Sequence, residues 1–60
     1  MLKKGDKFKV IKDHHEVHGD LSKGSIVVLL EINDRQMYYV KDLETSNTFT
    51  VSRDSVERMP

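Results

Sequence analysis

The chain of 60 residues contains no cysteine and no apolar segment long enough to cross a membrane. Without cysteine, disulfides and thiolate zinc sites are both excluded, and their absence suits a reducing compartment. A membrane helix needs roughly 20 apolar residues, and no segment comes close to that length. We therefore expect a soluble, cytoplasmic protein with a single domain over residues 1–60. The initiator methionine and the end of the chain after the last expected strand suggest a complete protein.

The sequence also lacks the usual signatures of an enzyme. A chain this short buries only about 60% of its unfolded surface, which leaves no room for a deep active-site cleft beside a core. There is no glycine-rich phosphate loop, no cysteine nucleophile and no serine in a nucleophile-elbow setting. The carboxylates fall in turn segments, where they are more often solubilising than catalytic. We expect neither catalytic activity nor a cofactor.

Opposite charges are separated along a chain whose net charge is zero. Residues 1–12 carry a local charge of +4, and residues 13–34 carry −4. Phosphate contacts supply most of the affinity of a non-specific nucleic-acid binder, so a basic patch at the amino terminus is one interpretation. The other is a set of solvated charges that keeps a small domain soluble. The lysines in question are Lys3, Lys4, Lys7, Lys9 and Lys12.

The longest apolar run lies within Leu21–Ile32 and predicts the central strand. Five consecutive aliphatic residues, Ile26 to Leu30, follow a turn at Gly24 and are rich in β-branched side chains. Such a run favours a strand that is buried on both faces over a surface helix. No segment shows helical periodicity, so we expect an all-β protein.

Strict alternation predicts the other strands and the side chains that face the core. The expected inward residues are Phe8 and Val10 in the first strand, Tyr38 and Val40 in Met37–Leu43, Phe49 and Val51 in Thr48–Val51, and Val56 in the last strand.

Polar segments separate these strands and predict the connections. The segment Lys12–Asp20 has no useful period and is expected to be a long loop, with Val17 and Leu21 folded back onto the core. Tight turns are expected at Asn33–Gln36 and Glu44–Asn47, and one helical turn at Ser52–Ser55.

Five short strands in so short a chain predict a small barrel, because a flat sheet would expose one apolar face. The order of features from Leu21 onward resembles a Src-homology-3 barrel. The corresponding segments are Leu21–Glu31 (diverging turn and second strand), Asn33–Gln36 (n-Src loop), Met37–Leu43 (third strand), Glu44–Asn47 (distal turn) and Phe49–Glu57 (fourth strand, helical turn and last strand). The resemblance implies a five-stranded barrel with one short helical turn before the last strand, and it places Val27 and Leu29 at core positions.

The residues with which that family binds polyproline are absent from this chain. Its members grip the rigid ligand with aromatic side chains. Met37, or Tyr38 in a register shifted by one, replaces the tryptophan of the third strand, Ser52 replaces the proline and Ser55 the tyrosine of the helical turn. The aromatic motif after the first strand is also missing, so we expect a barrel that does not bind polyproline.

The opening of the chain is similar to a second family, the KOW-type barrels of ribosomal and transcription-elongation proteins. The similarity lies in Lys4–Ile11 and Lys23–Val27. It implies contact with RNA or with a polymerase. That family places basic residues in the intervening loop, where this chain has Asp13, Glu16 and Asp20.

Three histidines, His14, His15 and His18, stand beside Asp20 in the expected loop. Imidazoles and carboxylates are ligands of zinc, nickel and copper. A loop, however, does not fix ligands at the roughly 2 Å distances that a metal site needs, so we expect no metal. The alternatives are an exposed polar loop and a pH-sensitive one, because histidine gains charge close to neutral pH.

The residues expected to bind a partner are Met37 and Tyr39, which face away from the core on alternation. Tyrosine and methionine are favoured at interfaces, although they also fill and cover small barrels. Val28 and Leu30 join them if the loop around Val17 leaves them uncovered.

We therefore expect a non-enzymatic protein-protein interaction module, as a monomer or weak homodimer. It would act as a subunit, an adaptor or a phage-encoded modulator of a host complex. The alternative is nucleic-acid binding through the amino-terminal lysines.

Overall fold

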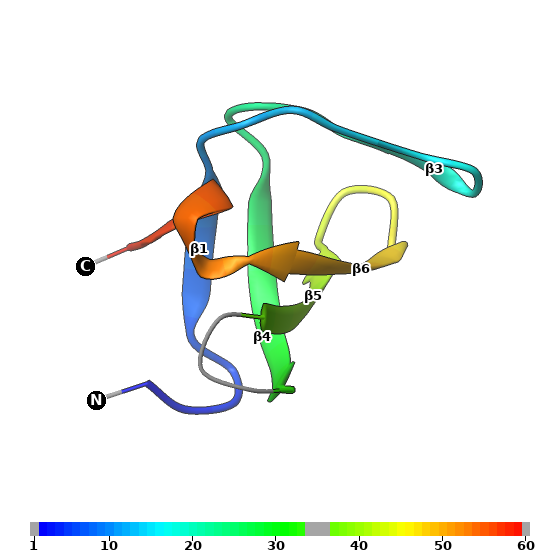
Figure 1. Ribbon diagram of the computed structural model, residues 1–60. Coiled ribbons are helices and arrows are strands. Elements are labelled where there is room, and N and C mark those ends of the chain that lie inside the picture. The colour runs from blue at the N-terminus through cyan, green and yellow to red at the C-terminus, as the bar shows by residue number, and fades with distance from the viewer. Residues whose placement is uncertain (1, 34–36, 60) are drawn as a thin grey trace.

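The computed structural model describes residues 2–33 and 37–59. The elements in chain order are β1 (Lys7–Val10), β2 (His14–Glu16), β3 (Gly19–Leu21), β4 (Ile26–Ile32), β5 (Met37–Asp42), β6 (Thr48–Ser52), the 3-10 turn η1 (Arg53–Ser55) and β7 (Val56–Arg58) (Figure 1). The all-β class, the five predicted strands and the predicted helical turn are confirmed.

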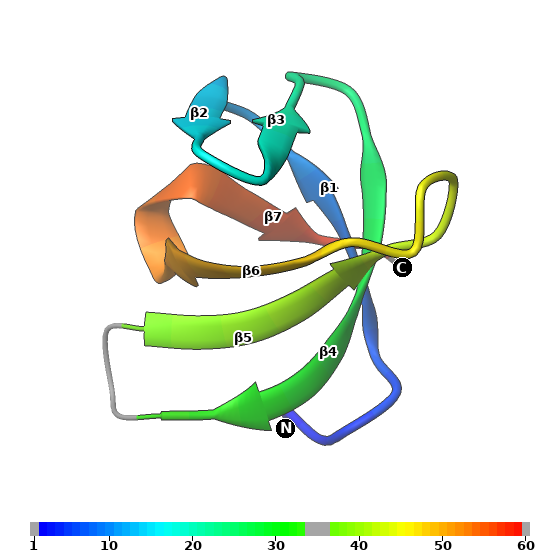
Figure 2. The ribbon, with the colours of Figure 1, turned by 90° about the vertical axis from the view of Figure 1, so that its right-hand side faces the viewer.

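The five predicted strands form one antiparallel sheet in the order β6-β5-β4-β1-β7. The sheet bends strongly, with β4 and β5 in the lower half of Figure 2 and β1 and β7 in the upper half. No ladder joins β6 to β7 within residues 2–33 and 37–59, so these two strands are the edges of the sheet. The closed barrel expected from the sequence is therefore not confirmed.

The central strand β4 has one buried face and one half-buried face, not two buried faces. Val27 and Leu29 are buried, whereas Ile26, Val28 and Leu30 are half-buried. The register between β4 and β5 shifts by one residue between Leu29 and Glu31, so that Leu30 is an extra residue at a β-bulge.

The core lies on the concave side of the sheet and is formed by every second residue of each strand. Phe8 and Tyr38 pack with ring centroids 5.6 Å apart. Each side chain predicted to face inward on alternation is buried. The buried apolar residues are Phe8, Val10, Leu21, Val27, Leu29, Tyr38, Val40, Phe49, Val51 and Val56, with Leu2 packed against them.

Residues 12–20 differ from the prediction, because they contain a β-hairpin where a loop was expected. Strands β2 and β3 pair antiparallel, with His14 opposite Leu21 and Glu16 opposite Gly19. The hairpin projects to the upper right in Figure 1. Alternation could not reveal it, since both faces of these strands are largely polar.

The two apolar residues expected to fold back onto the core behave differently. Leu21 is fully buried, as predicted. The prediction for Val17 is wrong, because this side chain is fully exposed, at 107%. Val17 lies in the turn that joins β2 to β3.

Strand β5 ends one residue earlier than predicted, at a buried aspartate. The Asp42 side chain is only 4% exposed, and its Oδ1 accepts a hydrogen bond from the Glu44 backbone at 2.8 Å. The Asp42 backbone is bonded to Asn47 O and Ser46 N, and Leu43 is 49% exposed. This aspartate therefore organises the predicted Glu44–Asn47 turn. Most of the other predicted turn, Asn33–Gln36, lies outside the described residues.

In the part of the chain that the structure describes, no helix is long and apolar enough to cross a membrane.

Replacing Asp42 with alanine should lower the free energy of unfolding by about 1–2 kcal/mol, because the Glu44 amide loses its acceptor. Asp42→Asn retains an oxygen at that position and should cost less than half as much. Urea denaturation followed by circular dichroism measures both values. Equal losses for the two variants would contradict the assigned role.

Replacing Leu21 with alanine should cost about 2–5 kcal/mol, as expected for a buried leucine. Val17→Ala, on the exposed tip of the same hairpin, should change stability by less than about 0.5 kcal/mol. Thermal denaturation compares the two variants under one condition. A Leu21→Ala protein as stable as Val17→Ala would show that the hairpin contributes nothing to the core.

Candidate functional site

The candidate site is the convex side of the sheet, called here the outer face. It is formed by the outward-facing side chains of β4 and of its two neighbours, β1 and β5. Its members are Lys7 and Lys9 of β1, Ile26, Val28 and Leu30 of β4, and Met37, Tyr39 and Lys41 of β5.

Strand register places one continuous row of outer-face residues across four strands. Val28 lies opposite Lys7 on one side and opposite Lys41 on the other, and Lys41 lies opposite Thr48. An aliphatic residue is therefore flanked on both sides by lysines. Because residues directly opposite each other have Cβ atoms about 5 Å apart, the three side chains are close neighbours.

A second row lies beside the first, toward the start of β4. Ile26 is opposite Lys9, and Lys9 is opposite Glu57 of β7. The apolar residue is again bordered by a lysine. Here a carboxylate follows at the margin of the face.

The third row contains the bulge and the aromatic residue of the outer face. Tyr39 is paired with Glu31, and Leu30 is the extra residue beside it. The Tyr39 hydroxyl donates a hydrogen bond to Thr48 Oγ1 at 3.0 Å, which inclines the ring along the sheet toward β6. Met37 is half-buried and lies two residues before Tyr39 on β5, opposite Ser52.

The four residues predicted to bind a partner all belong to this face. Val28 and Leu30 are two residues apart on β4, and Met37 and Tyr39 are two residues apart on β5. All four are half-buried. Sequence reasoning did not include Ile26 and Lys41 in the site. Alternation already places Ile26 beside Val28 on one face of the strand, but only the register shows that Lys41 adjoins Val28.

The five amino-terminal lysines lie in and around β1. Lys7 and Lys9 point outward from β1, whereas Lys3 and Lys4 precede this strand and Lys12 follows it. Lys41 of β5 joins Lys7 beside Val28. Within the described residues, the ammonium groups of Lys7, Lys9 and Lys41 form no ion pair; the two ion pairs present are His15–Asp20 and Arg58–Asp6.

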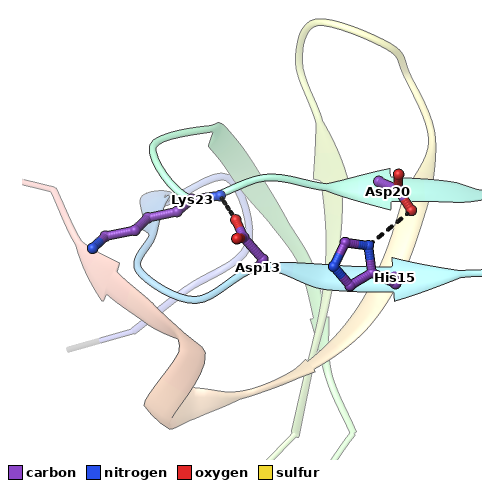
Figure 3. A network of polar contacts seen from close by, with 4 residues as sticks. All are labelled: Asp13, His15, Asp20 and Lys23. Carbon is purple, nitrogen blue, oxygen red and sulfur yellow. Dashed lines mark hydrogen bonds and ion pairs between the residues drawn. The ribbon is translucent and has the colours of Figure 1, made fainter.

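The polar contacts at the hairpin tie its strands to each other and to the chain that follows (Figure 3). An Asp13 carboxylate oxygen accepts from the Lys23 backbone at 2.6 Å, while the Lys23 side chain points away. His15 Nδ1 lies 3.3 Å from Asp20 Oδ1, in an exposed pair. Both aspartates thus serve the local structure.

His18 anchors the hairpin tip to β6. Its Nε2 lies 2.8 Å from the carbonyl oxygen of Thr48, and since a carbonyl can only accept, this nitrogen carries the hydrogen. The imidazole also packs against the Phe49 ring, with centroids 4.9 Å apart. The hairpin therefore docks beside β6 and leaves the outer face of β4 uncovered.

The three histidines have different surroundings. His18 is bonded to β6, His15 is paired with Asp20, and His14 Nε2 is buried without a hydrogen-bond partner. Over residues 2–33 and 37–59, no three histidine, aspartate or glutamate side chains gather closely enough to hold a metal ion. The same residues enclose no pocket.

Comparison with known proteins does not assign this chain to a family. A scan against protein-family models gives no match, and searches of curated proteins and of solved structures give no significant match.

Replacing His18 with alanine should loosen the hairpin, because the variant loses both the bond to Thr48 and the contact with Phe49. We expect about 1 kcal/mol less protection of the β2 and β3 amides in hydrogen exchange. His15→Ala is the matched control, since exposed ion pairs contribute little. Equal loss of protection in the two variants would contradict the anchoring role of His18.

Proposed function

We propose that this protein is a non-enzymatic interaction module that binds another protein through its outer face. The observation that carries the proposal is the row of Ile26, Val28 and Leu30, which are only half-buried. They lie at every second position of the central strand, whose main contacts within the described chain are with the paired strands β1 and β5. Covering such a row removes apolar surface from water, which is the main driving force of association.

The architecture that we propose is a divergent Src-homology-3-like barrel. The strand order, the hairpin between β1 and β4, and the 3-10 turn between β6 and β7 support it. Binding of polyproline is not part of the proposal. Ser52, at the position of the family's proline, caps η1 by accepting from Asp54 N at 3.3 Å, and Ser55 is buried. Neither residue offers the aromatic surface that a polyproline helix needs.

Such a module would serve in the cytoplasm as a subunit, an adaptor or a phage-encoded modulator of a host complex. Tyr39 and Met37 would contribute the larger contact surfaces, as side chains of both types do at interfaces. Val28 and Leu30 would form the centre of the contact.

Nucleic-acid binding is the second candidate, favoured by the free ammonium groups of Lys7, Lys9 and Lys41 beside an aromatic ring. Two observations make it the weaker one. Glu57 lies opposite Lys9 and reduces the local positive charge. The centre of the outer face is a row of aliphatic side chains, which a phosphate backbone does not bury.

Affinity capture from a lysate, followed by mass spectrometry, tests the proposed surface. The wild type should retain a partner that the double variant Met37→Ala, Tyr39→Ala loses, because both large contact side chains are gone. Glu44→Ala together with Thr45→Ala, in the exposed turn after β5, should retain it. Recovery of the same partner by the outer-face variant, or of none by the wild type, would overturn the proposal.

A salt titration separates the two candidates. Affinity for DNA or RNA should fall steeply as salt rises, with a logarithmic slope of about −0.7 to −0.9 for each phosphate contacted. An apolar protein interface should respond weakly. Fluorescence anisotropy of labelled DNA and RNA provides the measurement, and no binding at low salt would exclude the second candidate.

A further inference from the structure

The apolar row on β4 has a defined length and direction. Ile26, Val28 and Leu30 follow each other at every second residue, and residues of a strand rise by about 3.4 Å each, so the row extends for roughly 14 Å. Three turns of an α-helix span about 16 Å. A ridge of apolar side chains on one helix would therefore cover the row.

Lysines border this row on both sides. Lys7 and Lys41 flank Val28 from neighbouring strands, which places their backbones about 10 Å apart, twice the strand spacing. Lys9 stands beside Ile26. The aliphatic stems of lysines extend an apolar surface while their ammonium groups remain in water at its rim.

Negative charge is confined to the margins of the outer face. Glu57 lies on β7, beyond Lys9, and Glu31 lies beside Tyr39 after the bulge. The central row, with Val28 between two lysines, carries no carboxylate. Its charge therefore disfavours a basic partner and complements an acidic one.

We propose that the partner bound by the outer face is an acidic amphipathic segment, with an apolar ridge over β4 and carboxylates on both sides of it. This inference rests on the proposed function and adds the chemistry of the partner. A helix with apolar residues three and four apart and with aspartate or glutamate beside them meets the requirement. Nucleic acid meets it less well, because a phosphate backbone has no apolar ridge to bury Val28.

Selection from a display library of random peptides, long enough for about four helical turns, tests the inference. The peptides are panned on the wild type and on the charge-reversed variant Lys7→Glu, Lys41→Glu. The matched control is Lys12→Glu, Lys23→Glu, which changes the net charge equally at exposed positions off the outer face. Val28→Thr keeps the β-branched shape and removes apolar surface. Circular dichroism confirms that each variant is folded.

The enriched peptides should carry aspartate and glutamate on both sides of an apolar repeat. They should bind the wild type and the control alike, and lose about tenfold or more in affinity to the charge-reversed variant. Their affinity should also fall with Val28→Thr and with added salt.

Other results would overturn the inference in distinguishable ways. Peptides that depend on Val28 but show no acidic bias and no need for the lysines would refute the acidic partner and leave the interaction module standing. No peptide sensitive to either outer-face variant would refute both. A random-sequence RNA or DNA pool that binds through Lys7 and Lys41 and displaces the peptides would assign the face to nucleic acid.

Discussion

Pairing of β4 with strands on both of its sides is the constraint on which the rest of the structure depends. Its backbone is hydrogen-bonded to β1 and to β5, and the Leu29 backbone is bonded to Asp6 and Gly5 at 2.8 Å each. Pairing on both sides fixes which face of β4 points to the concave side of the sheet. Val27 and Leu29 therefore enter the core, and the aliphatic residues between them face outward.

Docking of the β2–β3 hairpin decides which parts of the sheet remain open. Because His18 binds the Thr48 carbonyl and packs on Phe49, the hairpin tip lies against the edge strand β6. Edge strands with free backbone groups invite pairing with other chains, and this contact occupies one such group. Because the hairpin lies against β6, it does not cover the outer face of β4. The position of the hairpin thus both protects the edge strand β6 and leaves the outer-face residues of β4 open to a partner.

The separation of charge in the sequence becomes a separation in space. The acidic residues of the hairpin are largely engaged nearby, as Asp13 is with the Lys23 backbone and Asp20 is with His15. The lysines of the outer face form no ion pair with any described residue. A neutral chain thus presents a local positive surface around apolar residues, which is the basis of both proposals.

The sequence by itself determined the strands of the main sheet and their inward residues, because alternation along a strand is a local pattern. Phe8, Val40 and Val51 were identified in this way, and the helical turn at Ser52–Ser55 was identified from its capping residues. Only the tertiary structure decided the hairpin, the burial of Asp42 and the row in which Val28 stands between two lysines. Register, capping and docking depend on hydrogen bonds and contacts between residues that no local period relates.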